Sequence, residues 1–99
     1  MKLNLYKPKK VLVSGESLIL SGPFWSTTLR PKDVRSIEIS RTLSLVDELG
    51  ITLTADAKYF FTDGVGAFAR IASILDFDGK FKSGWYARAE RGENLVFEA

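Results

Sequence analysis

The sequence predicts a single α+β domain over residues 1–99: an antiparallel strand meander, one packing helix and a C-terminal extension that ends in a strand. Three observations support this prediction. Short runs of alternating apolar and polar residues recur through the first two thirds of the chain, with turn-forming residues between them. The apolar period then lengthens to that of a helix near residues 64–77. A chain of 99 residues is also long enough to build one hydrophobic core.

The alternating runs come first along the chain. They lie at residues 11–13, 18–20, 24–29, 36–40, 42–45, 51–54 and 58–62. The links between them are short and rich in Gly, Pro, Ser and Asp, whereas parallel strands need crossovers of about a dozen residues or more. We therefore expect about six antiparallel strands that form a partly closed barrel or a curved sheet with one buried face.

One helix is predicted near residues 64–77. Apolar residues at spacings of three and four define its core face. These residues are Phe68, Ile71, Ala72 and Leu75. Asp63 is a suitable N-cap, because its carboxylate can accept hydrogen bonds from the N–H groups of the first turn. We expect this helix to cover the open face or end of the meander.

The C-terminal extension begins with a turn at Asp78-Gly79. Residues 84–91 form either a short helix that ends before Gly92 or the first arm of a hairpin, and their helix-forming residue types slightly favour the helix. The apolar run at residues 95–97 predicts a final strand.

The composition excludes several classes of site. The chain has no Cys and no His, which excludes disulfides, Ser–His–Asp triads, Cys–His pairs and ordinary zinc sites. Only a hard cation would accept the remaining oxygen ligands, and no metal or cofactor is predicted. The chain shows neither the apolar stretch of a signal peptide nor a membrane-spanning run, so we expect a cytoplasmic protein.

No motif completes a catalytic site. The segment at 76–79 resembles the paired-aspartate motif of haloacid-dehalogenase-like phosphatases, but it ends a predicted helix, and Lys80 stands where that motif has Thr. Ser17 lies in a partial nucleophile elbow without a His to activate it. We therefore predict that the protein is not an enzyme. The alternative is a carboxylate-based or metal-dependent enzyme, and convergence of Asp56, Asp63, Asp76 or Asp78 in a cleft would favour it.

Aromatic residues supply the candidate protein interface. Neighbouring aromatics on a strand point to opposite faces, so one member of each pair leaves the main core and becomes available to a second layer or to a partner. The candidate interface residues are Phe24, Trp25, Phe60, Trp85 and Tyr86.

The N-terminus is the basic part of a chain whose net charge is only +2. No acidic residue precedes Glu16. The candidate anion contacts are Lys2, Lys7, Lys9 and Lys10. Such a cluster would attract a phosphate backbone or an anionic membrane. The favoured interpretation is simpler, since lysines on an edge strand also discourage strand-to-strand aggregation.

Residues 16–24 and 29–39 combine a strand, a turn, an aromatic-rich strand and a strand start of the form D-V-x-x-I-x-I. In these features, and in the apolar helix near residues 68–75, the chain resembles bacterial pleckstrin-homology-like domains. The resemblance implies a barrel plugged by a helix and used as a scaffold for protein contacts. The loop at residues 14–16 lacks the basic residues of lipid-binding members, so phosphoinositide binding is not implied.

We therefore predict a small non-enzymatic protein-interaction module of adaptor or inhibitor type. Its partner is expected to be another protein, and homo-oligomerisation through an exposed edge strand is compatible with the same pattern. The alternative is a surface binder of anionic partners, either membrane or nucleic acid, through the basic N-terminus. The nearly balanced charge makes that alternative the less favoured one.

Overall fold

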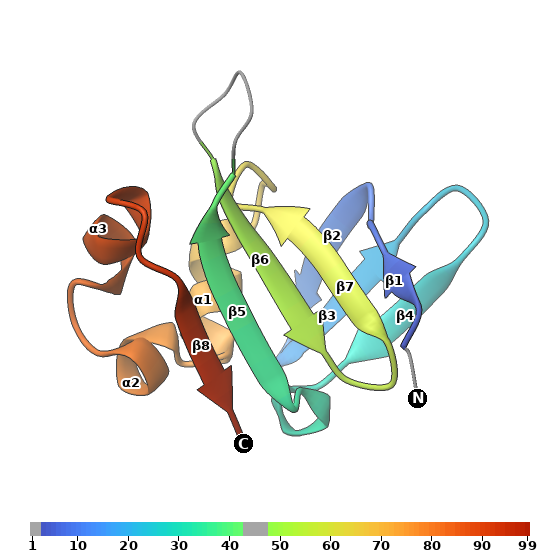
Figure 1. Ribbon diagram of the computed structural model, residues 1–99. Helices are drawn as coiled ribbons and strands as arrows, with labels where there is room; N and C mark the ends of the chain where they lie inside the picture. Colours follow the sequence, from blue (N-terminus) through green and yellow to red (C-terminus); the bar gives the residue numbers. More distant parts are fainter. Residues whose placement is uncertain (1–2, 43–47) are drawn as a thin grey trace.

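The computed structural model describes residues 3–42 and 48–99, which form two sheets, three short α-helices and one 3₁₀ turn (Figure 1). The larger sheet contains, in spatial order, β1 (Leu5–Tyr6), β7 (Lys58–Thr62), β6 (Leu49–Thr54), β5 (Ser36–Arg41) and β8 (Leu95–Glu98). The smaller sheet contains β2 (Lys10–Ser14), β3 (Ser17–Ser21) and β4 (Ser26–Leu29). Figure 1 shows the smaller sheet behind the right side of the larger one, with the helices behind and beside the left side.

The larger sheet is an antiparallel meander with one strand added at each edge. In the meander of β5, β6 and β7, Ile39 lies opposite Ile51, which in turn lies opposite Phe61. At one edge β8 pairs antiparallel with β5 after the chain has passed through the helices. At the other edge β1 pairs parallel with β7 through only Leu5 and Tyr6.

The smaller sheet is a second antiparallel meander. Gly15 has a φ of 60° in the tight turn between β2 and β3, a backbone conformation that costs glycine little. A 3₁₀ turn at Pro31–Asp33 follows β4 and leads the chain into β5 of the larger sheet. Asp33 accepts a hydrogen bond from the Arg30 N–H at 3.0 Å, which stabilises this turn.

The helical region consists of α1 (Phe68–Ile74), α2 (Phe77–Phe81) and α3 (Trp85–Glu90). Asp76 separates α1 from α2, because its left-handed φ of 55° interrupts the helix. The Asp76 carboxylate then accepts a hydrogen bond from the Gly79 N–H at 3.2 Å and caps α2. Gly84, with a φ of 84°, precedes α3 in the same conformation.

The core is formed by the inner faces of both sheets and by the helices. Leu18 and Leu20 of β3 and Ile51 of β6 are fully buried, as alternation along each strand requires. On the helical side Phe77 is fully buried, and its ring lies 5.3 Å from that of Trp85 in an edge-to-face contact. The two sheets and the three helices therefore share one apolar cluster.

The α+β class is confirmed, while the strand arrangement differs from the prediction. Within the described residues seven strands precede the helices and one follows them, in two open sheets, whereas about six strands before the helix were expected in one partly closed barrel or curved sheet. The strand expected at 24–29 begins only at Ser26, because the Gly22 N–H donates to the Trp25 carbonyl at 3.0 Å and closes a turn. Most of the run expected at 42–45 lies outside the described residues.

The single helix expected near 64–77 is also wrong in detail. The chain makes turns from Asp63 to Ala67, and α1 starts at Phe68. Asp63 does not cap it, because the Asp63 carboxylate accepts a hydrogen bond from the Leu49 N–H instead. The turn expected at Asp78-Gly79 lies inside α2. Residues 85–90 form a helix, as slightly favoured, and the final strand is confirmed as β8.

Candidate functional site

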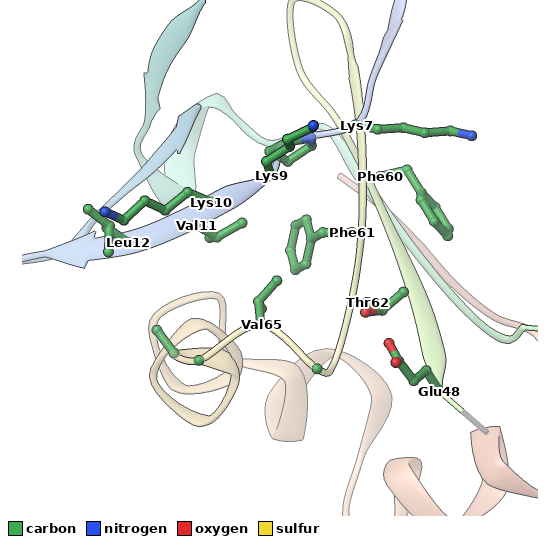
Figure 2. A pocket seen from close by; sticks show the side chains of 14 residues that line it. Lys7, Lys9, Lys10, Val11, Leu12, Glu48, Phe60, Phe61, Thr62 and Val65 are labelled. Carbon is green, nitrogen blue, oxygen red and sulfur yellow. The ribbon is translucent and has the colours of Figure 1, made fainter. Parts of the chain in front are cut away.

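A groove of about 790 Å³ lies between β2 of the smaller sheet and β7 of the larger sheet (Figure 2). Its lining comes from residues 7–12, from residues 60–67 except Asp63, and from Glu48. The volume lies within the range of about 300–1,000 Å³ that is typical of ligand pockets. The groove therefore offers room for a small ligand or for a short peptide segment.

One wall of the groove is basic. Lys7, Lys9 and Lys10 line it, and all three side chains are exposed. The Lys9 N–H donates to the Ser21 carbonyl at 2.9 Å, which fixes the chain where it enters β2. Within residues 3–42 and 48–99, none of these lysines takes part in an ion pair. Among the described lining residues only Glu48 is acidic, so the three lysines give that part of the groove a positive charge that attracts anions.

The floor of the groove is apolar. Val11 and Phe61 belong to the buried core, and Val65 packs against that core while lining the groove. Leu12 extends this surface and is 45% exposed. In Figure 2 Val11, Phe61 and Val65 lie close together on one side of β7. An occupant that carries apolar groups would remove this surface from water.

The edge of β7 that faces the groove is only partly paired. The Asp63 N–H donates to the Leu49 carbonyl of β6 at 3.0 Å, and hydrogen-bonding direction alternates along a strand. The N–H of Thr62 and the carbonyl of Phe60 therefore point to the outer edge. The ladder with β1 ends at Tyr6 and Tyr59, one residue before these two groups.

Pro8 explains why this ladder stops. The Lys58 N–H donates to the Asn4 carbonyl at 2.8 Å, and in a parallel ladder the donors of the added strand follow at every second residue. The donors of the added strand are then the N–H groups of residues 6 and 8, and the N–H of residue 8 would have to donate to the Phe60 carbonyl. Proline has no N–H, so β1 cannot continue, and the edge of β7 is left open where the groove begins.

Asp63 fixes the end of this open edge. Its Oδ1 accepts the Leu49 N–H at 3.0 Å, and its Oδ2 accepts the hydroxyl of Tyr86 from α3. This hydrogen bond, together with burial and the charges of Asp63 and Glu90, raises the pKa of Tyr86 to about 12. The contact joins α3 to the β6–β7 hairpin directly after Thr62.

The five candidate interface aromatics lie in three separate places. Phe24 and Trp25 occupy the turn between β3 and β4, where Phe24 is 99% exposed. Trp25 is half-buried, and its ring centroid lies 5.1 Å from that of Tyr6. Phe60 lies in the groove on the outer face of the larger sheet, over Gly50, where a Cβ atom would come within 2.7 Å of its ring.

Trp85 and Tyr86 lie on α3, away from the other three aromatics. Trp85 is only 7% exposed, and its Nε1–H donates to Asp78 at 2.8 Å. Its burial leaves little indole surface for a partner. Tyr86 is 39% exposed and is held by Asp63. The candidate interface is therefore not one continuous surface in this structure.

The candidate anion contacts are better grouped. Lys7, Lys9 and Lys10 all line the groove, and Lys2 lies outside the described residues. Sequence reasoning missed the apolar floor beside these lysines, because Val11, Phe61 and Val65 come from separate segments of the chain. Pro8 was the available signal, because a proline directly after a short strand marks the end of a ladder.

Within residues 3–42 and 48–99, the four aspartates considered for acid–base chemistry do not share a hydrogen-bond partner. Asp56 accepts a hydrogen bond from Tyr59, and Asp63 accepts from Leu49 and Tyr86. Asp76 accepts from Gly79, and Asp78 accepts from Trp85. In the part of the chain that the structure describes, no group of three or more acidic side chains is arranged to hold a metal ion.

No family model matches the chain, and neither a curated protein nor a solved structure matches it. The resemblance to pleckstrin-homology-like domains stays a prediction, since nothing in these comparisons supports or contradicts it. No helix within the described ranges is long and apolar enough to cross a membrane. The function must therefore be argued from the groove itself.

Proposed function

We propose that this chain is a protein-interaction module that binds an extended segment of a partner protein in the groove between β2 and β7. The segment alternates apolar and acidic residues and adds to the open edge of β7. The observation that supports this proposal most directly is the coincidence of three features in one groove: an unpaired strand edge, an apolar floor and a basic wall.

The geometry defines one central residue of the partner segment. Its N–H would donate to the Phe60 carbonyl and its carbonyl would accept the Thr62 N–H, the two groups that β1 does not reach. This residue then lies opposite Phe61, and paired residues share a face of the sheet. Its side chain would therefore contact Phe61 and Val65, which favours an apolar residue.

The flanking residues of the segment would face the other side of the sheet, because side chains alternate along a strand. Figure 2 shows Phe60 and Lys7 on that side, opposite Phe61. Acidic flanking residues would be attracted to Lys7, with Lys9 and Lys10 adding to the field at the groove mouth. The preferred pattern is therefore acidic–apolar–acidic.

The same lysines suggest the alternative, an anionic membrane or a nucleic acid. A phosphate backbone would use the positive charge but would leave the apolar floor and the two backbone groups of β7 unused. A peptide uses all three features. We therefore favour the peptide, although the expected affinity is modest, since two backbone hydrogen bonds contribute only about 1 kcal/mol each.

The test uses the isotopically labelled protein and an acetylated, amidated hexapeptide of alternating Glu and Val. We expect saturable NMR shifts centred on Thr62, Phe61 and Lys9, with a Kd of about 0.01–1 mM that weakens as salt rises. Hydrogen exchange of the Thr62 amide should slow in the complex, because that N–H gains an acceptor.

Three matched controls separate strand addition from simple charge attraction. The same peptide with N-methylated valines lacks the central donor and should bind about tenfold more weakly. A Lys–Val repeat should not bind. The variant Lys9→Gln/Lys10→Gln should bind less tightly than wild type, whereas Lys32→Gln/Lys58→Gln removes the same charge outside the groove and should bind nearly as tightly as wild type.

Equal binding of the N-methylated and unmodified peptides would refute strand addition. Failure of every peptide, together with binding of a single-stranded oligonucleotide or of phosphatidylglycerol vesicles through the same lysines, would establish the alternative function instead.

A further inference from the structure

A second hollow, of about 330 Å³, lies at β1 and shares no lining residue with the groove. Residues 4 and 6 line this hollow, whereas residues 7–12 line the groove. The remaining lining comes from the first residues of β4 and the turn before them, from the turn between β6 and β7, and from Tyr59. Figure 1 shows β1 and β4 on the same side of the molecule.

Three aromatic rings form the apolar part of the hollow. The Tyr6 ring centroid lies 5.1 Å from that of Trp25 and 5.7 Å from that of Tyr59, onto which Tyr6 stacks at 21°. Tyr59 is buried, whereas Tyr6 is 36% exposed and Trp25 is half-buried. The rings of Tyr6 and Trp25 therefore present surface to a ligand, and Tyr59 supports them from the core side.

One carboxylate completes the lining. Asp56 is exposed, and its Oδ1 accepts the Tyr59 hydroxyl at 3.0 Å. Burial and this hydrogen bond raise the pKa of Tyr59, so Tyr59 remains protonated and continues to donate to Asp56 at neutral pH. Among the residues that the structure describes, the lining contains no basic side chain, and its other polar side chains are those of Asn4, Ser26 and Thr27.

The chemistry of this lining is opposite to that of the groove. Aromatic ring faces carry partial negative charge, and a cation within about 6 Å of a ring centroid is attracted to them. The chain shows the same contact elsewhere, where the Lys80 Nζ lies 5.3 Å from the Phe97 centroid. A single carboxylate supplies too few oxygen ligands for a calcium or magnesium ion but one counter-charge for a monovalent cation.

We propose that this hollow binds an organic cation of the alkylated ammonium type. Its methyl groups would pack against the Tyr6 and Trp25 rings, and its charge would be balanced by Asp56. A quaternary ammonium fits better than a metal ion or a bare ammonium, because its charge is spread over apolar surface that the rings can desolvate. This site is independent of the peptide groove, so either proposal can fail alone.

The test exploits the two tryptophans as separate reporters. Trp25 lies in the hollow, whereas the Trp85 indole donates to Asp78 within the helical cluster. Choline chloride should shift the Trp25 indole N–H resonance saturably below about 50 mM and leave that of Trp85 unchanged. The uncharged isostere 3,3-dimethylbutan-1-ol should produce a far smaller shift, because it lacks the charge.

Two variants and one further ligand sharpen the result. Asp56→Asn keeps an acceptor for Tyr59 and should weaken choline binding about tenfold. Tyr6→Leu should weaken it similarly, whereas Tyr86→Phe, on α3, should not change it. Blocked Nε-trimethyllysine in place of choline distinguishes a peptide side chain from a free small molecule as the source of the cation.

The proposal is overturned if choline leaves the Trp25 resonance unmoved at about 50 mM. It is equally overturned if the uncharged isostere binds as well as choline, or if both indole resonances move together. These measurements use the wild-type protein, so they decide the matter even if a variant fails to fold.

Discussion

Replacing Tyr86 by Phe tests how much the contact between α3 and the β6–β7 hairpin contributes to stability. The Tyr86 hydroxyl donates to the carboxylate of Asp63, which also holds the Leu49 N–H. The substitution removes one hydroxyl group and keeps the ring, whose contacts with Phe68 and Trp85 at 6.4 and 5.5 Å remain. The lost free energy of unfolding is therefore that of the hydrogen bond.

The pKa of Tyr86 sets an upper limit for this contribution. A rise from 10.0 to about 12 corresponds to about 2.7 kcal/mol at 1.36 kcal/mol for each unit. Because Tyr86 is 39% exposed, solvent screening lowers the expected value to about 1 kcal/mol. We therefore expect Tyr86→Phe to lower the free energy of unfolding by about 1 kcal/mol at neutral pH.

The pH dependence provides the sharper assay. The pKa of Tyr86 is higher in the folded protein than in the unfolded chain, so the contribution is complete below about pH 10 and is lost as the pH rises towards about 12. Urea unfolding followed by far-UV circular dichroism should separate wild type from Tyr86→Phe by about 1 kcal/mol at about pH 8. The difference between wild type and variant should largely disappear near pH 12, which is about the pKa of Tyr86 in the folded protein.

A difference between wild type and variant that is the same at both pH values would refute this reasoning. Tyr6→Phe serves as the control for the loss of a tyrosine hydroxyl, because none of the hydrogen bonds found within the described residues involves the Tyr6 hydroxyl. In an Asp63→Asn background, Tyr86→Phe should cost clearly less than in wild type, as expected for two residues that interact directly.

One further prediction concerns stability, and another concerns the packing of Trp25. Phe77→Ala should lower the free energy of unfolding by about 3–5 kcal/mol in urea titrations, because the Phe77 side chain is fully buried among aromatic rings. Gly22→Ala should expel Trp25 from its ring contacts and red-shift its fluorescence, since the new Cβ would lie 2.2 Å from the Trp25 Nε1. Gly66→Ala, where nothing lies within 4 Å, is the matched control and should leave the fluorescence unchanged.

Local sequence pattern predicted the strands whose neighbours along the chain are also their neighbours in space. Strands β2 and β3, with the short turn between them, and strands β5, β6 and β7 were expected because each strand contains alternating residues. Both the alternation and the turn chemistry are local properties, so they can be recognised without the fold.

The helical region was misjudged where a single residue determined the break. The apolar spacing that continues to Phe77 gave no warning that Asp76 adopts a left-handed conformation. An aspartate can either continue a helix or cap the next one, and its carboxylate caps α2 here. Asp63 was misassigned for the same reason. Its carboxylate accepts hydrogen bonds from Leu49 of β6 and from the distant Tyr86, rather than from the following helix.

The sequence by itself determined the α+β class, the absence of thiol and imidazole chemistry and the basic character of residues 7–10, because these depend on composition and local periodicity. The tertiary structure decided that β1 pairs with β7 and ends before Pro8, and that Lys9 lines the same groove as the apolar floor. It also decided that Tyr6 meets Trp25. Such contacts join residues that are distant along the chain, and the packing of the whole core selects among the many pairings that local pattern permits.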